Sequence, residues 1–217
     1  MKTAQYAKVI KCFEELPVDG ATINDLDLEY VSDYCRKIGY EKGDAEHYLR
    51  CNHGFLTTRG GGEVVSSAAV LLFGKDPQRF FPSARMRFTR YEGRISEGAE
   101  DWRYEVKRAE FTGRIPEQVM QATAFIKKQI REYTKLGEGA VFRTTPEYPE
   151  FCWTELIRNA AAHRDYGACD MEIRIKMFED HFTVESPGVL PDTVRISDRS
   201  EERRVGKECR SRWSPYH

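Results

Sequence analysis

The segment from Phe151 to Tyr166, FCWTELIRNAAAHRDY, most constrains the fold because it has helical spacing on two faces. A carboxylate, an amide and an imidazole recur in it every four residues: Glu155, Asn159 and His163. A helix turns by about 100° per residue, so these three side chains share one face. Small or apolar residues fill the other side: Leu156, Ile157, Ala160 and Ala161. The spacing predicts a helix that packs on a sheet, and its polar row either lines a pocket or is a solvated face without function.

Strand patterns follow this helix. Apolar residues alternate with charged ones from Met171 to Met177, which is typical of a half-buried strand. Phe182 and Val184 indicate a second strand, and residues 179–181 are short enough to join the two as a hairpin. A Pro-Gly turn then spans Ser186 to Gly188. The order of helix, hairpin and turn predicts an α+β fold.

The first half of the chain is expected to begin with two helices. The first runs from Leu28 to Ile38, with Asp25 or Asp27 as its N-cap, and the second runs from Asp44 to about Cys51. The segment that follows, residues 55–63, contains three consecutive glycines. It is compatible with a winged-helix fragment, but the lack of a basic recognition face favours a helical connector with a glycine turn.

Three further segments have a predicted element. The apolar run from Val64 to Phe73 favours a helix because of its Ser-Ser-Ala-Ala centre, and Ala84 to Tyr91 alternates as a strand does. A long scaffold helix is predicted from Ile115 to Gly137, with Pro116 in its first turn and Gly137 after its end. Phe142 to Thr145 is expected to form a strand.

Composition describes an ordinary globular protein, with 217 residues, 40% hydrophobic residues and a formal charge of -1. No run reaches the ~20 apolar residues of a membrane helix, and the start lacks a signal-peptide core, so the expectation is a cytoplasmic protein without a membrane partner. The cysteines have no C-x-x-C pair, which argues against a zinc site or a disulfide framework and predicts reduced, mostly buried thiols. They are Cys12, Cys35, Cys51, Cys152, Cys169 and Cys209.

Residues 199–217 lack apolar periodicity and resemble the translated read-through of a sequencing-library adapter. They are therefore excluded from fold reasoning, and the natural chain is expected to continue beyond Asp198. Without them the chain has 34 - 6 = 28 basic and 35 - 3 = 32 acidic residues, a net charge of -4. The remainder shows no electrostatic signature of DNA binding.

ELIRNAAAHRDY, followed some twenty residues later by ESPGVLP, resembles the N-box and first glycine box of the GHKL (Bergerat-fold) ATPases. The form is the divergent one of bacterial proteins labelled RecG-like ATP-dependent helicases or transcriptional regulators. LLFGKDPQRFFPSARMRF and EYPEFCW are similar to the middle region of that subfamily, so the resemblance covers most of residues 14–198.

The resemblance implies a domain order. Residues 1–21 would be the remnant of an upstream Schlafen AlbA-type domain, and 22–92 a helical or mixed middle region. Residues 93–150 would supply strands and a scaffold helix, and 151–198 an incomplete Bergerat-type α/β sandwich. The second glycine box and a downstream winged helix would lie outside the chain.

The resemblance also implies ATP and Mg²⁺ as cofactors. Asn159 would be the Mg²⁺ ligand, and Glu155 would orient or deprotonate the attacking water. The lip of the pocket would be shaped by His163, Arg164 and Asp165. Glu185 would accept from the adenine amino group, and Gly188 would belong to the adjoining turn. Val189 stands where the general pattern has a glycine, and Glu185 is longer than the usual Asp, so weak binding is expected. The second glycine box, which caps the phosphates in the family, is missing from these residues, so no hydrolysis is expected of this chain.

Two hypotheses of different classes follow. The first is a fragment of an ATP-binding GHKL-type regulator of nucleic-acid transactions, in which nucleic acid would be contacted by regions missing from this chain. The second is a non-catalytic regulatory or protein-interaction module that keeps the Bergerat scaffold. A true helicase ranks third, because the sequence has no Walker A motif. No oligomeric state is predicted.

Overall fold

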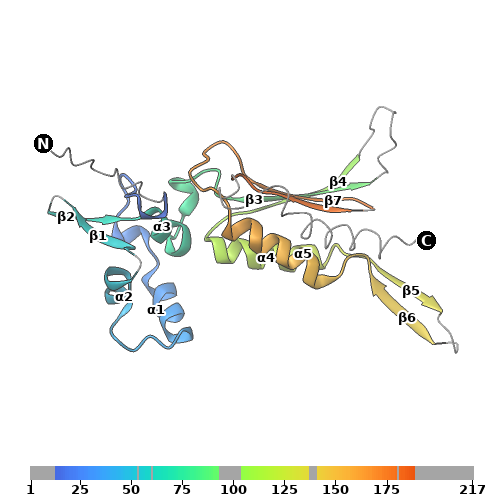
Figure 1. Ribbon diagram of the computed structural model, residues 1–217, viewed down its shortest axis with the longest axis horizontal. Helices are drawn as coiled ribbons and strands as arrows, with labels where there is room; N and C mark the ends of the chain where they lie inside the picture. The colour runs from blue at the N-terminus through green and yellow to red at the C-terminus, as the bar shows by residue number, and fades with distance from the viewer. Residues whose placement is uncertain are drawn as a thin grey trace, which may run out of the picture. The chain divides into compact units, whose positions relative to one another are not determined.

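A computed structural model describes residues 13–52, 54–59, 61–92, 104–136, 141–179 and 181–188. The chain divides into two compact units at Pro82 and Ser83, and their helices and strands form an α+β fold (Figure 1). The predicted range 22–92 therefore joins residues of both units. Strand β3, from Met86 to Glu92, pairs with strands of the second unit.

The first unit packs three short helices against a β-hairpin. These elements are α1 (Leu28–Lys37), α2 (Ala45–Cys51), β1 (Leu56–Arg59), β2 (Gly62–Val65) and α3 (Ser67–Phe73). Short 3₁₀ turns occur at Phe13–Glu15, Ile23–Asp25 and Pro77–Arg79. Both predicted helices are confirmed: the Asp27 side chain accepts from the Tyr30 amide, and that of Asp44 accepts from the His47 amide. The core contains Val31, Leu49, Val65 and Ala69.

The prediction of one helix from Val64 to Phe73 is wrong at its start. Val64 and Val65 belong to β2, and the helix begins at Ser67 because the Ser66 hydroxyl accepts from the Ala69 amide at 3.3 Å. Two helices followed by a hairpin is the element order of the winged-helix interpretation. The other interpretation, a helical connector, predicted a glycine turn. Such a turn connects β1 to β2, and Gly61 in it has a φ of 85°.

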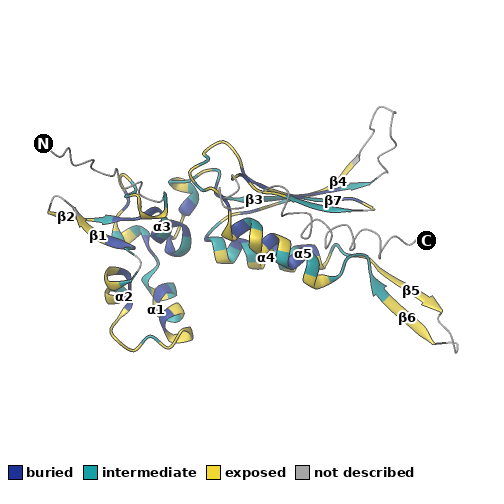
Figure 2. Ribbon diagram, viewed as in Figure 1, coloured by how far each residue is buried: buried dark blue, intermediate teal, exposed yellow. Residues whose placement is uncertain are grey.

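The second unit contains a four-stranded sheet in the order β4-β3-β7-β8. β3 pairs antiparallel with β4 and parallel with β7, while β8 pairs antiparallel with β7. Helices α4 and α5 lie along one face of this sheet (Figure 1), and each helix carries buried residues (Figure 2). The buried apolar residues of both helices form one core with residues of β3 and β7. The bounds are β4 (Tyr104–Phe111), α4 (Ile115–Lys127), α5 (Glu150–Ala162), β7 (Ile173–Met177) and β8 (Phe182–Glu185). The predicted strands at 84–91, 171–177 and 182–184 are confirmed.

The predicted helix from Ile115 to Gly137 is wrong in its second half. α4 ends at Lys127, and β5 (Glu132–Leu136) then pairs antiparallel with β6 (Phe142–Pro146) as a separate hairpin. Cross-strand pairing prevails over the helical spacing, because the partner strand satisfies the backbone of residues 132–136. Every residue of β5 is exposed, so the hairpin lies outside the core (Figure 2). Gly137 lies outside the described residues.

Candidate functional site

Helix α5 is anchored on the sheet by its predicted apolar side. Trp153 is 1% exposed and Ile157 is fully buried, and both belong to the core formed with β3 and β7. The Thr154 hydroxyl donates to the Glu150 carbonyl at 2.7 Å and supports the first turn. Leu156 differs from its prediction, because 46% of it is exposed. The helix therefore faces the sheet through residues 153, 157 and 161.

The three residues of the predicted polar row lie away from the core. Glu155 is half-buried, whereas Asn159 and His163 are exposed. His163 is the C-cap residue, and its amide donates to the Asn159 carbonyl at 3.0 Å. The carboxylate and the amide thus lie one turn apart on a surface that a ligand can reach.

The loop after α5 is held by Arg164, which the resemblance placed at the lip of the pocket, and by Tyr166, which was given no role. The Arg164 guanidinium is buried and donates to the Met171 carbonyl at 2.7 Å and to the Ser83 hydroxyl at 3.4 Å. It also lies over the Tyr166 ring, 4.9 Å from the ring centroid, and the Tyr166 hydroxyl donates to the Ala161 carbonyl. Arg164 and Tyr166 therefore connect the end of α5 to the starts of β3 and β7.

Burial changes the acid–base behaviour of both side chains. Loss of solvation lowers the pKa of Arg164, although the neighbouring Tyr166 and Glu172 oppose that shift. Burial raises the pKa of Tyr166 to about 12, and the Arg164 charge opposes this rise. The only signal of these roles in the sequence was the HRDY tetrapeptide, which marked the loop without saying which side chains point inward.

The turn after β8 packs against the end of α5. The Ser186 hydroxyl donates to the Ala160 carbonyl at 2.9 Å, and the Asp165 amide donates to the Pro187 carbonyl at 2.8 Å. Gly188 has a φ of 155°, and a Cβ there would lie 3.4 Å from the His163 carbonyl oxygen. The fold thus brings Gly188 to the end of the polar row, beside the His163 carbonyl.

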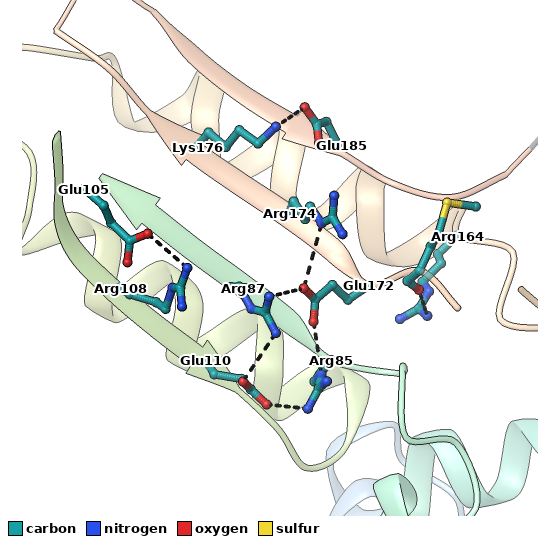
Figure 3. Close-up of polar contacts among 11 residues, drawn as sticks. Arg85, Arg87, Glu105, Arg108, Glu110, Arg164, Glu172, Arg174, Lys176 and Glu185 are labelled. Atoms are coloured by element: carbon teal, nitrogen blue, oxygen red, sulfur yellow. Dashed lines mark hydrogen bonds and ion pairs between the residues drawn. The ribbon is translucent and has the colours of Figure 1, made fainter. Parts of the chain in front are cut away.

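Glu185 does not join this group. It lies opposite Arg174 in the β7–β8 register, and its carboxylate oxygen is 2.5 Å from Lys176 Nζ. Figure 3 shows these side chains on the sheet face opposite the helices. Side chains alternate along a strand, so the inward position of Val184 directs Glu185 outward. The predicted adenine contact through Glu185 is therefore corrected, and Ser186 is the polar side chain of this turn that faces α5.

An ion-pair network covers the same open face. The Glu172 carboxylate, with 8% of its side chain exposed, lies 3.1 Å from Arg85, 2.9 Å from Arg87 and 3.8 Å from Arg174 (Figure 3). Glu110 adds a contact of 2.8 Å to Arg85. The network joins β3, β4 and the start of β7. It was not predicted, because its members come from segments far apart in the sequence.

The described residues contain no cluster of three or more His, Cys, Asp or Glu side chains that could hold a metal ion. An exposed amide oxygen such as that of Asn159, combined with phosphate oxygens and water, is the kind of donor set that Mg²⁺ prefers. No disulfide occurs in the described part of the chain. The prediction that the thiols are mostly buried is wrong there, because Cys51 and Cys169 are exposed. The described part of the chain does not include Cys12, Val189, Cys209 or residues 199–217.

Within the described residues, no helix is both long and apolar enough to cross a membrane.

The chain matches no family model and no curated protein. It is similar to the crystal structure of the DIP2311 protein from Corynebacterium diphtheriae, with a TM-score of 0.57 and 22% sequence identity. The match covers 85% of this chain and 35% of that one, so the chain spans about a third of the length of this structural neighbour. The likeness shows the fold alone.

Proposed function

We propose that the second unit carries one wall of an adenine-nucleotide site of the GHKL type. Mg²⁺-ATP would lie against the exposed polar side of α5 and the turn at Ser186–Gly188. The observation that carries the proposal is the packing of this turn on the helix end, where Gly188 approaches the His163 carbonyl. Two motifs about twenty residues apart are adjacent in the fold, and their order agrees with the N-box and first glycine box that the sequence resembles.

Each residue has a role that its position permits. The exposed Asn159 oxygen would bind Mg²⁺, and Glu155, one turn earlier, would orient a water molecule toward a metal-bound phosphate. Gly188 would let the nucleotide approach the backbone, and His163 would border the site. Glu185 has no role in this proposal because it pairs with Lys176 on the far face of the sheet.

The protein would act as an ATP-binding, DNA-associated regulator in which nucleic acid is contacted through regions other than this site. This part of the proposal rests on the resemblance to the RecG-like regulator subfamily. The alternative is a regulatory or protein-interaction module that keeps the scaffold without turnover. Mg²⁺-dependent ATP binding with and without Asn159→Ala distinguishes the two, because only the first hypothesis requires a nucleotide that is held through Asn159.

The test is titration of a fluorescent ATP analogue with and without Mg²⁺. Asn159→Ala removes the oxygen ligand and is expected to weaken Mg²⁺-dependent binding by roughly tenfold, equivalent to about 1.4 kcal/mol. Asn159→Asp keeps an oxygen donor and is expected to retain the dependence on Mg²⁺. Arg158→Ala, an exposed neighbour on the same helix, is the matched control. The proposal would be contradicted if the ATP analogue did not bind, or if its affinity were unchanged both by removal of Mg²⁺ and by Asn159→Ala.

A further inference from the structure

A thiol, an imidazole and a phenol form a chain of contacts on the surface of the first unit. Cys51 Sγ lies 3.5 Å from Nε2 of His47, one turn earlier on α2. The other ring nitrogen of His47, Nδ1, lies 2.8 Å from the Tyr40 hydroxyl. Cys51 and His47 are both exposed. A nucleophile and a base are therefore in contact at a place that small molecules can reach.

The His47 ring is held in place by its surroundings. A Cβ at Gly43 would lie 2.6 Å from the ring Cγ, so the ring occupies space that only a glycine leaves open. Tyr40 packs edge-on against the buried Tyr48, with ring centroids 5.1 Å apart. The Asp44 carboxylate accepts from the His47 amide at 2.8 Å and fixes the backbone below the ring. These contacts fix the base relative to the thiol.

Neighbouring charges leave His47 as the group that can activate the thiol. Cys51 is the last residue of α2, where the unpaired carbonyl groups disfavour a thiolate. Arg50 could oppose that effect, but it is paired with Glu46 at 3.0 Å and with Glu63 at 2.8 Å. A thiolate at Cys51 therefore depends on proton transfer to His47.

We propose that Cys51 is a modification site that exchanges with low-molecular-weight disulfides, with His47 as its base. His47 Nε2 takes the thiol proton, and Nδ1–H donates to the Tyr40 oxygen. The Cys51 thiolate attacks one sulfur of the small disulfide, whose S–S bond breaks as a new mixed disulfide forms. The departing thiolate takes the proton from His47, so Cys51 is oxidised and the small molecule leaves as a thiol.

The test compares two cysteines of one chain. Cys169 is also exposed, but its Sγ contacts the Gly167 carbonyl and not an imidazole. The chain is treated with 5,5′-dithiobis(2-nitrobenzoate), and the labelling rate of each cysteine is followed by peptide mass spectrometry. Cys51 is expected to react roughly three to ten times faster than Cys169, because His47 is in contact with the Cys51 thiol and can take its proton.

Two variants separate activation from mere exposure. His47→Gln removes the base, and Gly43→Ala displaces its ring; each is expected to lower the Cys51 rate to that of Cys169 while the Cys169 rate stays unchanged. Equal rates for the two cysteines in the unaltered chain would overturn the proposal without any variant. A fast Cys51 that is unaffected by His47→Gln would also overturn it.

Discussion

Arg164→Met tests whether the buried guanidinium holds the loop beside the candidate site. Methionine keeps an unbranched apolar stem of similar length and removes the charge and all donors. The Met171 carbonyl loses the donor at 2.7 Å, and the Tyr166 ring loses the cation above it. We expect the second unit to lose stability, because the first contact connects the loop after α5 to the start of β7 and the second holds Tyr166 in that loop.

The size of the loss follows from opposing contributions. A hydrogen bond from a charged donor contributes about 1.5–3 kcal/mol, and a partly desolvated cation–π contact about 1 kcal/mol. Against this, the guanidinium is buried, and its Nε has no hydrogen-bond partner among the described residues. Removing that desolvated group raises the free energy of unfolding by on the order of 1 kcal/mol. The expected net decrease in the free energy of unfolding is about 1.5–3 kcal/mol.

Urea unfolding measures this decrease. Trp153, 1% exposed in the core of the second unit, reports the transition when Trp102 and Trp213 are replaced by Phe. Arg174→Met is the control, because the Arg174 side chain is 53% exposed and lies 3.8 Å from Glu172. Its loss should stay below about 0.5 kcal/mol. Equal effects of the two substitutions, or no effect of Arg164→Met, would refute the assigned role.

Three further predictions address the helix, the turn and the buried phenol. Ile157→Ala should lower the free energy of unfolding by about 2–5 kcal/mol, and Leu156→Ala by less than about 1 kcal/mol, because Ile157 is fully buried and Leu156 is 46% exposed. Similar losses would contradict the orientation of the helix. Gly188→Ala should detach the turn, at about 1–3 kcal/mol for a side chain at a φ of 155°, and hydrogen exchange should accelerate at the Asp165 amide. The pKa of Tyr166 is about 12 in the folded protein, above its unfolded value of about 10, so its contribution is complete below pH 10 and is lost as the pH rises toward 12. Urea midpoints at pH 9 and 11 should therefore differ less in Tyr166→Phe, and an unchanged difference would argue against this assignment.

Sequence periodicity predicted the elements whose pattern is local. α1, α2, α5 and β7 were found because their capping residues or apolar periods lie within the element itself. β5 was missed because residues 132–136 fit a helical stripe, and their strand conformation depends on β6, a separate segment. The inward positions of Arg164 and Tyr166 depend on a loop without a period. The four-residue spacing of His47 and Cys51 can be read from the sequence. The sequence does not show that the absence of a side chain at Gly43 leaves room for the His47 ring.

Glu185 shows why a motif and a strand period must be compared. The motif placed its carboxylate in the nucleotide site, whereas the period of two that directs Phe182 and Val184 inward directs Glu185 outward. The structure follows the period, and Glu185 pairs with Lys176. Strand alternation decides here because reversing it would move two apolar side chains out of the core. The residue after the strand, Ser186, is free of that constraint and faces α5.

The exposed side chains around the polar row favour a ligand wall over a solvated face. Phe151 is 78% exposed and Leu156 46%, and both lie on the helix outside the stripe that meets the sheet. A solvated helix face carries mostly charged groups, whereas a ligand site combines apolar surface with a few polar groups. Leu156→Ala should therefore weaken binding of the ATP analogue several-fold while the urea midpoint hardly changes. If the affinity for the ATP analogue falls in Asn159→Ala but is unchanged in Leu156→Ala, the apolar part of this wall does not contact the nucleotide.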